Sequence, residues 1–236
     1  MSIDLALHHC ELAQVERVTL AACQGGQASW GPCSIATDTP MTAVTFPFTE
    51  PSRCKRLKAA SSRDHDSVDQ LVMAARPFES RERYGRFLQV QHRFHGSLLA
   101  LYQDEQLNQQ LPGLAALSRF AAVEADLRDL GLPLPTPTQP VRVSSAQALG
   151  WLYCSEGSNL GAAFLYKHTQ RLGLEGDNGA RHLAPHPDGR ALHWREFVAR
   201  LDSLVLGEQE EAEVVAGAIA AFDSYRVHLR EVFAGS

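Results

Sequence analysis

Beyond residue 50, apolar side chains recur at intervals of three and four positions, which is the spacing of amphipathic helices. No alternating run of strand length interrupts this pattern, so it predicts an all-α fold. The first helix is expected from about Pro51 to about Ala75, because proline suits a first helical turn and Pro77 disfavours helix just before it. Ser80 is placed to cap the next helix.

Glycine and proline divide the rest of the chain into further helices. Pro112-Gly113 ends a short helix, and Gly131 with the prolines that follow it predicts a stiff, extended connection. Ser144 and Gln147 have the spacing of a capping box at the start of a long helix. The helices expected after Gly113 cover residues 114–130, 144–172, 194–204 and 208–233.

The first fifty residues differ from the rest of the chain. Gly25-Gly26, Gly31-Pro32 and the segment Thr37–Pro40 interrupt any helical period. We therefore expect residues 1–50 to be a poorly ordered or peripheral extension, and residues 51–236 to form one domain. Met41 is an alternative start site, and the sequence leaves this point open.

Composition and charge narrow the classes of function. Hydrophobic residues make up 44% and charged residues 21% of the chain, which is ordinary for a globular domain. The formal charge of -5 and the lack of a basic run argue against a nucleic-acid-binding surface. Neither a signal peptide nor a membrane span is apparent, so a cytoplasmic protein is expected. The cysteines are odd in number and form no C-x-x-C pair, which favours a reducing compartment: Cys10, Cys23, Cys33, Cys54 and Cys154.

Two glycines four residues apart, Gly157 and Gly161, lie inside the helix predicted over 144–172. Each costs about 1 kcal/mol of helix stability relative to alanine, so a close approach to the main chain is expected to compensate. The small residues around them leave one side of the helix nearly bare. That side suits either a tightly packed neighbouring helix or a flat, bulky ligand, and the spacing alone leaves both interpretations open.

His65 shares the inner face of the first predicted helix with Val68 and Val72, and Lys58 lies two turns earlier on the same face. An imidazole there is either a core histidine with a hydrogen-bonded ring or an axial ligand of heme iron. The second role needs a neutral ring nitrogen in an apolar slot and a nearby cation for a propionate, which Lys58 would supply. The helical pattern itself does not choose between these roles.

Two polar side chains, Gln91 and His95, lie one turn apart on an otherwise apolar helical stripe. If they are buried they need partners, because an unpaired buried polar group costs about 1–3 kcal/mol. A shared hydrogen-bond network is the simplest solution. Asp69, Arg119 and Trp194 are candidates to complete it, although the default expectation for the two charged residues is a solvated side chain.

Four segments taken together carry a resemblance to a known family. They are LKA at 57–59, HDSVD at 65–69, GWLYCSEGSNLG at 150–161 and GARHLAPHPDG at 179–189. The combination resembles the bacterial heme oxygenases used for iron acquisition. The likeness extends from about Leu57 to Phe233 and leaves residues 1–50 uncovered.

The resemblance implies the heme oxygenase fold, in which heme lies between a proximal and a distal helix. His65, on the proximal helix, would then be the axial ligand of the heme iron. Gly157 and Gly161, with Ser158 and Asn159, would bring the main chain of the distal helix close to the oxygen-binding side of heme b (haem b).

The same resemblance assigns the remaining candidate residues. Lys58 and Tyr153 match positions that anchor the heme propionates, and together they favour opening of the ring at the α-meso carbon. Five residues match the family's distal polar network, which delivers protons: Asp69, Gln91, His95, Arg119 and Trp194.

The activity that the resemblance implies is the opening of heme, with oxygen and a reductant, to biliverdin, carbon monoxide and ferrous iron. The chain shows no nucleotide-binding glycine motif, so electrons would come from an external reductase or ferredoxin. A heme carrier or sensor on the same fold and a di-iron oxidase are the rival interpretations. A monomer is favoured, and the sequence does not decide the oligomeric state.

Overall fold

The computed structural model describes residues 52–234, and the regular elements within this range are helices. The all-α prediction is therefore confirmed, while the expectation for residues 1–50 lies outside the described residues. In chain order the elements are α2 Arg53–Ala74, α3 Arg81–Gln103, α4 Glu105–Gln110, the 3-10 helix η2 Leu114–Leu117, α5 Phe120–Asp129, α6 Ser145–Thr169, the 3-10 helices η3 Gln170–Leu172 and η4 Arg181–Leu183, α7 Arg190–Ser203 and α8 Glu208–Phe233.

Local capping signals set several of the helix boundaries. The hydroxyl of Ser80 accepts a hydrogen bond from the backbone N–H of Arg83 at 3.1 Å and begins α3 as predicted. Ser144 and Gln147 form the predicted capping box at the start of α6. At the other end of this helix, Gly173 adopts the left-handed conformation with φ 68° and stops the chain from continuing as a helix.

The predicted helix over residues 114–130 is wrong in one respect, because the structure breaks it into η2 and α5. Ser118 is extended, with φ -58° and ψ 126°, and Arg119 precedes the first residue of α5. The Arg119 guanidinium donates to the backbone carbonyl groups of His182 and Ala184, far away in the sequence. A tertiary contact thus accompanies this break, and the local pattern of apolar residues does not reveal it.

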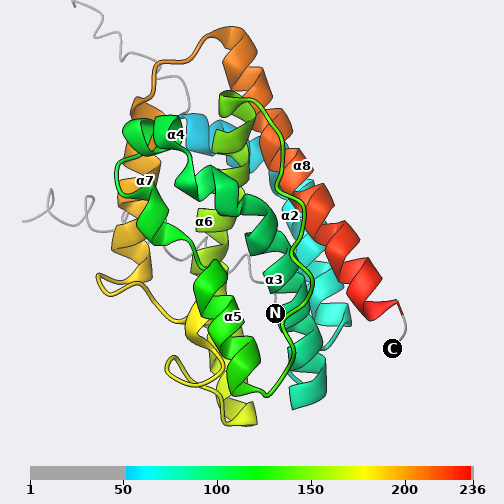
Figure 1. Cartoon of the computed structure of the whole chain (residues 1–236). Coiled ribbons are helices and arrows are strands. Elements are labelled where there is room, and N and C mark those ends of the chain that lie inside the picture. The colour runs from blue at the N-terminus through cyan, green and yellow to red at the C-terminus, as the bar shows by residue number, and fades with distance from the viewer. Residues whose placement is uncertain (1–51, 235–236) are drawn as a thin grey trace, which may run out of the picture.

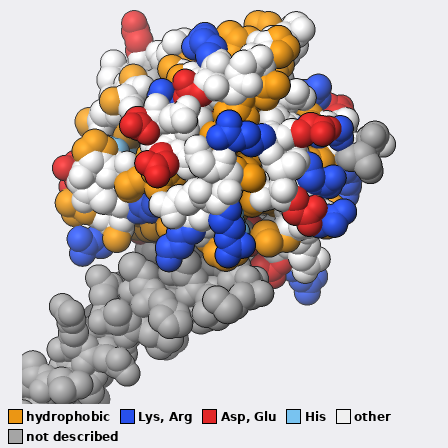
Figure 2. Space-filling model, turned by 90° about the horizontal axis from the view of Figure 1, so that it is seen from below, with side chains coloured by type: hydrophobic (Ala, Val, Ile, Leu, Met, Phe, Trp, Pro, Cys, Tyr) orange, Lys and Arg blue, Asp and Glu red, His pale blue; other side chains and the backbone are white. Residues whose placement is uncertain are grey.

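α6 lies among the other helices, and α8 runs along one side of the molecule (Figure 1). α8 contacts α6, α2 and α3, while α5 packs against α3 and η4. None of the helices described between residues 52 and 234 is long and apolar enough to cross a membrane. On the described part of the face shown in Figure 2, basic and acidic side chains are mixed with apolar ones, as expected for a chain without basic runs.

Two glycines allow α6 and α8 to touch through their main chains. A Cβ atom at Gly150 of α6 would overlap the carbonyl oxygen of Val214 and lie 2.5 Å from the nitrogen of Ala218. A Cβ atom at Gly217 of α8 would likewise overlap the carbonyl oxygen of Gln147. The contact is reciprocal, so the distance between these two helices depends on both glycines.

Replacement of Gly217 by alanine is expected to lower the free energy of unfolding by about 1–3 kcal/mol, because the added methyl group must push the two helices apart. Helix propensity alone predicts a gain of up to about 1 kcal/mol for the same change. Urea unfolding followed by circular dichroism measures the difference. Ala216→Gly, at an exposed position of the same helix, is the control for propensity, and a Gly217→Ala protein more stable than the wild type would contradict the close contact.

Candidate functional site

The helical core contains a cavity of about 670 Å³ lined by α2, α3, α6, α7, α8, η4 and the residue before α5. Its volume lies within the range of small-molecule and cofactor sites. Every residue singled out from the sequence lines this cavity: Lys58, His65, Asp69, Gln91, His95, Arg119, Tyr153, Gly157, Ser158, Asn159, Gly161 and Trp194. Side chains that are far apart in the sequence are therefore gathered around one space.

His65 lies on the α2 wall of the cavity. Its Nδ1 atom lies 3.6 Å from Oδ2 of Asp69, one helical turn later, and its ring meets the edge of Phe222 from α8 at 5.9 Å between centroids. With Nδ1 beside a carboxylate, Nε2 is the ring nitrogen left for a ligand. A carboxylate behind the outer nitrogen is a common way to orient a metal-binding histidine.

Asp69 lies near both His65 and the polar side chains around Gln91. The resemblance groups it with the distal polar residues, yet it follows His65 on α2 and lies beside that imidazole. It also lies near Tyr225 of α8, whose hydroxyl accepts a hydrogen bond from Nε2 of Gln91 at 2.8 Å. Burial raises the pKa of Tyr225, and the nearby Asp69 charge raises it further. Asp69 thus faces the polar group around Gln91 as well as His65.

Gly157 and Gly161 lie in the wall of the cavity formed by α6. A Cβ atom at Gly157 would meet only the ring of Trp194, at 3.4 Å, which is an ordinary van der Waals contact. The tight helix crossing on α6 lies two turns earlier, at Gly150. Of the two interpretations of this glycine pair, the position of Gly157 thus favours access to the cavity over helix packing.

A buried carboxylate, Glu156, holds this part of α6 against two other helices. It is only 1% exposed, and its Oε1 accepts a hydrogen bond from the hydroxyl of Tyr102 in α3 at 2.5 Å. Its Oε2 accepts from Nε2 of His193 in α7 at 2.8 Å and from the amide of Asn159 at 3.2 Å. Because Gly157 is the next residue, these bonds also fix the glycine segment. Sequence reasoning missed Glu156, whose signal was an acidic residue within a largely apolar helix.

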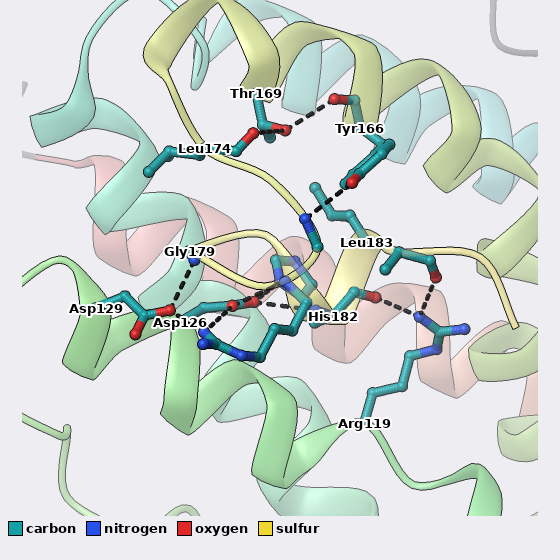
Figure 3. A network of polar contacts seen from close by, with 12 residues as sticks. Arg119, Asp126, Asp129, Tyr166, Thr169, Leu174, Gly179, His182 and Leu183 are labelled. Carbon is teal, nitrogen blue, oxygen red and sulfur yellow. Dashed lines mark hydrogen bonds and ion pairs between the residues drawn. The ribbon is translucent and has the colours of Figure 1, made fainter. Parts of the chain in front are cut away.

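The side of the cavity near α5 and η4 carries polar side chains whose pKa values are lowered. Burial, with smaller contributions from His182 and Arg119, lowers the pKa of His95 to about 3. Its Nδ1 is buried without a hydrogen-bond partner among the described residues. Burial also lowers the pKa of Arg119, whose guanidinium reaches η4 (Figure 3). His182 of η4 lines the same cavity and was not predicted as a site residue.

Basic side chains and a neutral phenol line another part of the cavity. Lys58 is accompanied there by Lys55 and by Arg195 of α7. The ring of Tyr153 packs against Trp194 with 5.6 Å between centroids. Burial raises the pKa of Tyr153, so its hydroxyl stays protonated and can donate a hydrogen bond to an anion.

Comparison with known proteins agrees with this geometry. The family model described as Heme oxygenase matches residues 52–231. The chain belongs to the heme oxygenase family. It is 44% identical over 185 residues to the heme oxygenase PigA of Pseudomonas aeruginosa, an alignment that covers 77% of this chain and 93% of the relative.

Two solved structures show how far the family fold is shared. The NO- and CO-bound heme oxygenase of Neisseria meningitidis is 49% identical, with a TM-score of 0.75 over 78% of this chain and 94% of the other. The heme oxygenase of Leptospira interrogans is 18% identical, with a TM-score of 0.63 over 77% of this chain and 100% of the other. The second likeness supports the fold alone.

The Glu156 interactions make a prediction about two tyrosines of α3. Tyr102→Phe is expected to lower the free energy of unfolding by about 1.5–3 kcal/mol, because it removes the buried hydrogen bond to the Glu156 carboxylate together with the one to the Ser155 hydroxyl at 2.7 Å. Tyr84, equally buried, donates to a neutral backbone carbonyl, that of Gly179, at 2.8 Å. Tyr84→Phe is the matched control and is expected to cost about 1 kcal/mol. Chemical unfolding of both variants tests the difference, and equal losses would mean that the carboxylate adds nothing.

Proposed function

We propose that this protein is a heme oxygenase that opens heme to biliverdin, carbon monoxide and ferrous iron and so releases iron. The observation that carries the proposal is one cavity bounded by the imidazole of His65 on α2 and by the segment from Gly157 to Gly161 on α6. A flat ligand with an iron atom at its centre needs a ring nitrogen on one side and a wall with few side chains on the other.

The residues around the cavity fit heme. Most of its lining surface is apolar, which suits a porphyrin, and among its polar side chains Lys58 and Tyr153 would supply partners for propionates. His95, neutral and with a buried unpartnered nitrogen, is suited to hold water on the polar side. When bound, heme supplies both the iron that takes up oxygen and the ring that is oxidised.

The side chains have separate tasks in this proposal. Nε2 of His65 would hold the iron, and an imidazole is a weaker electron donor than a thiolate. Gly157 and Gly161 would leave heme room to lie against the main chain of α6. The distal polar residues bind and orient the water that carries protons: Asp69, Gln91, His95, Arg119, Trp194, Ser158 and Asn159.

An external reductase or ferredoxin completes the reaction in this proposal, because the chain has no nucleotide-binding glycine motif. The two described cysteines, Cys54 and Cys154, are buried free thiols, which agrees with a reducing cytoplasm. We favour a monomer as the working unit.

A heme carrier or sensor on the same fold is the second candidate, because it would share His65 and the cavity. The cluster around Gln91, His95 and Arg119 favours the enzyme, since a carrier does not need a polar group for proton delivery. A di-iron oxidase is disfavoured by side-chain placement: within residues 52–234, no three His, Cys, Asp or Glu side chains converge as that centre requires.

One experiment distinguishes a heme oxygenase from a heme carrier. The purified protein is incubated in air with heme and with either ascorbate or a ferredoxin system as the reductant. We expect the heme absorption to decay, a biliverdin band to appear and a ferrous chelator to colour. A stable heme spectrum under these conditions, with heme still bound, would leave only the carrier.

His65→Ala is expected to weaken heme binding and abolish ring opening, because the iron loses its protein ligand, and external imidazole should restore part of the turnover. Heme titration followed by absorption spectroscopy measures the first effect, and biliverdin formation the second. His186→Ala is the matched control: its side chain has the same exposed fraction, 32%, but does not line the cavity. Unchanged turnover in His65→Ala would remove this histidine from the proposal.

The orientation of heme in the cavity makes a further prediction. With Lys58 and Tyr153 holding the propionates, the α-meso carbon should lie at the restricted side of the ring, and biliverdin IXα should be the main product. Chromatography of the extracted product identifies the isomer. The double variant Lys58→Ala and Tyr153→Phe should give a mixture, whereas a product other than the α isomer from the wild type would contradict the proposed anchoring.

A further inference from the structure

A second histidine, His182 of η4, faces the cavity and is paired with a buried carboxylate on α5 (Figure 3). Its ring nitrogen Nδ1 lies 2.7 Å from Oδ2 of Asp126. The two residues are 3% and 0% exposed, so water does not compete for this hydrogen bond. In such a pair the imidazole donates Nδ1–H to the carboxylate, which fixes the tautomer of the ring.

Asp126 also holds the backbone from which His182 projects. Its Oδ1 accepts a hydrogen bond from the backbone N–H of Arg181 at 2.8 Å, and its Oδ2 accepts from the backbone N–H of His182 at 3.0 Å. One turn later on α5, Asp129 accepts from the backbone N–H of Gly179 at 2.7 Å and pairs with Arg181. The loop is thus bound to α5 at several points, and the ring orientation has little freedom.

The fixed tautomer leaves Nε2 as a hydrogen-bond acceptor on the far edge of the ring. This nitrogen is buried and has no hydrogen-bond partner among residues 52–234. Leaving it unpaired costs about 1–3 kcal/mol, and a water in the adjoining cavity would remove that cost. His95 lines the same cavity and has a second buried nitrogen without a described partner.

A purely structural role does not account for the imidazole. The backbone N–H groups of residues 181 and 182 already satisfy both oxygens of Asp126, so the loop would remain attached without the ring. Burial lowers the pKa of His182, while its bond to Asp126 opposes this effect. The ring therefore stays neutral at pH 7, and its Nε2 can accept a hydrogen bond.

We propose that His182, oriented by Asp126, is a positioning residue of the heme cavity: its Nε2 accepts a hydrogen bond from a water and holds that water in the cavity that His95 also lines. The inference rests on the proposed heme-degrading function and adds two residues, His182 and Asp126, to the distal polar group. A water held in this way donates one of its hydrogens to His182, which fixes the direction of the other hydrogen and leaves it available to a ligand in the cavity.

The first experiment uses heme-free protein and needs no activity. Nitrogen-15 NMR of labelled histidine rings, with His182 assigned by comparison with His182→Gln, reports which ring nitrogen carries hydrogen. We expect a protonated Nδ1 and an unprotonated, hydrogen-bonded Nε2. A spectrum with hydrogen on Nε2 would overturn the proposal whatever the activity of the enzyme.

The second experiment compares His182→Phe with His182→Gln in heme-loaded protein. His182→Phe should bind heme as the wild type does, but should open the ring about tenfold more slowly, because the water loses the nitrogen that positions it. Its rate should also fall more steeply in heavy water than the wild-type rate does. His182→Gln, whose amide oxygen can accept the same hydrogen bond, should recover most of the loss.

The control is His92→Phe. Like His182, His92 of α3 is buried and has a ring nitrogen, here Nδ1, without a partner among the described residues. Unlike His182, it does not line the cavity. We expect it to change neither the rate nor the solvent isotope effect. If His182→Phe keeps both wild-type values, the proposal falls while the heme oxygenase function stands. If the wild type itself binds heme without opening it, the function fails, and the NMR result still decides the tautomer of His182.

Discussion

The main-chain contact between α6 and α8 is the constraint on which the rest of this structure depends. Because neither Gly150 nor Gly217 has a Cβ atom, the two helices approach until backbone meets backbone. This contact fixes the axis of α6 near its start. Two turns later the same helix carries Gly157, which now borders a cavity instead of another helix. A helix with one end held so tightly can present an almost bare surface to a ligand without collapsing onto the space.

Two buried carboxylates continue this support around the cavity. Glu156 binds side chains of α3 and α7, and so holds the glycine segment of α6 from behind. Asp126 binds the loop that carries His182 and so holds the opposite, polar side. Removing one partner of such a buried charge is costly, because the remaining group is left desolvated. The cavity is therefore framed by groups that resist displacement, which is what an active site needs to orient water and ligand.

Much of the fold could be predicted because its signals are local. Ser80, the Ser144 capping box and the last helix over residues 208–233 follow from residues within one turn of each boundary. The break before α5 could not be predicted in this way, since it accompanies hydrogen bonds from Arg119 to a loop more than sixty residues later. α7 likewise begins at Arg190, directly after Gly189 with φ 87°, four residues before the predicted start.

In the candidate site, too, some residues could be predicted from the sequence and others could not. The helical pattern singled out His65 and the glycine pair, a resemblance supplied their expected roles, and the structure places them around one cavity. Glu156 and His182 were missed because a sequence does not tell a buried acid or imidazole from a solvated one, and acidic residues are mostly exposed. Their importance comes from partners on other helices, Tyr102 and Asp126.

The polar atoms of the cavity connect its stability to its occupancy. Nδ1 of His95 and Nε2 of His182 are buried and have no partner among the described residues, so each would cost about 1–3 kcal/mol without a water or ligand beside it. Water that enters the cavity meets this need in the heme-free protein. A ligand that displaces such a water without replacing its hydrogen bonds loses binding free energy, whereas a ligand that leaves the water in place does not. The two imidazoles thus favour a ligand that keeps water on that side of the cavity.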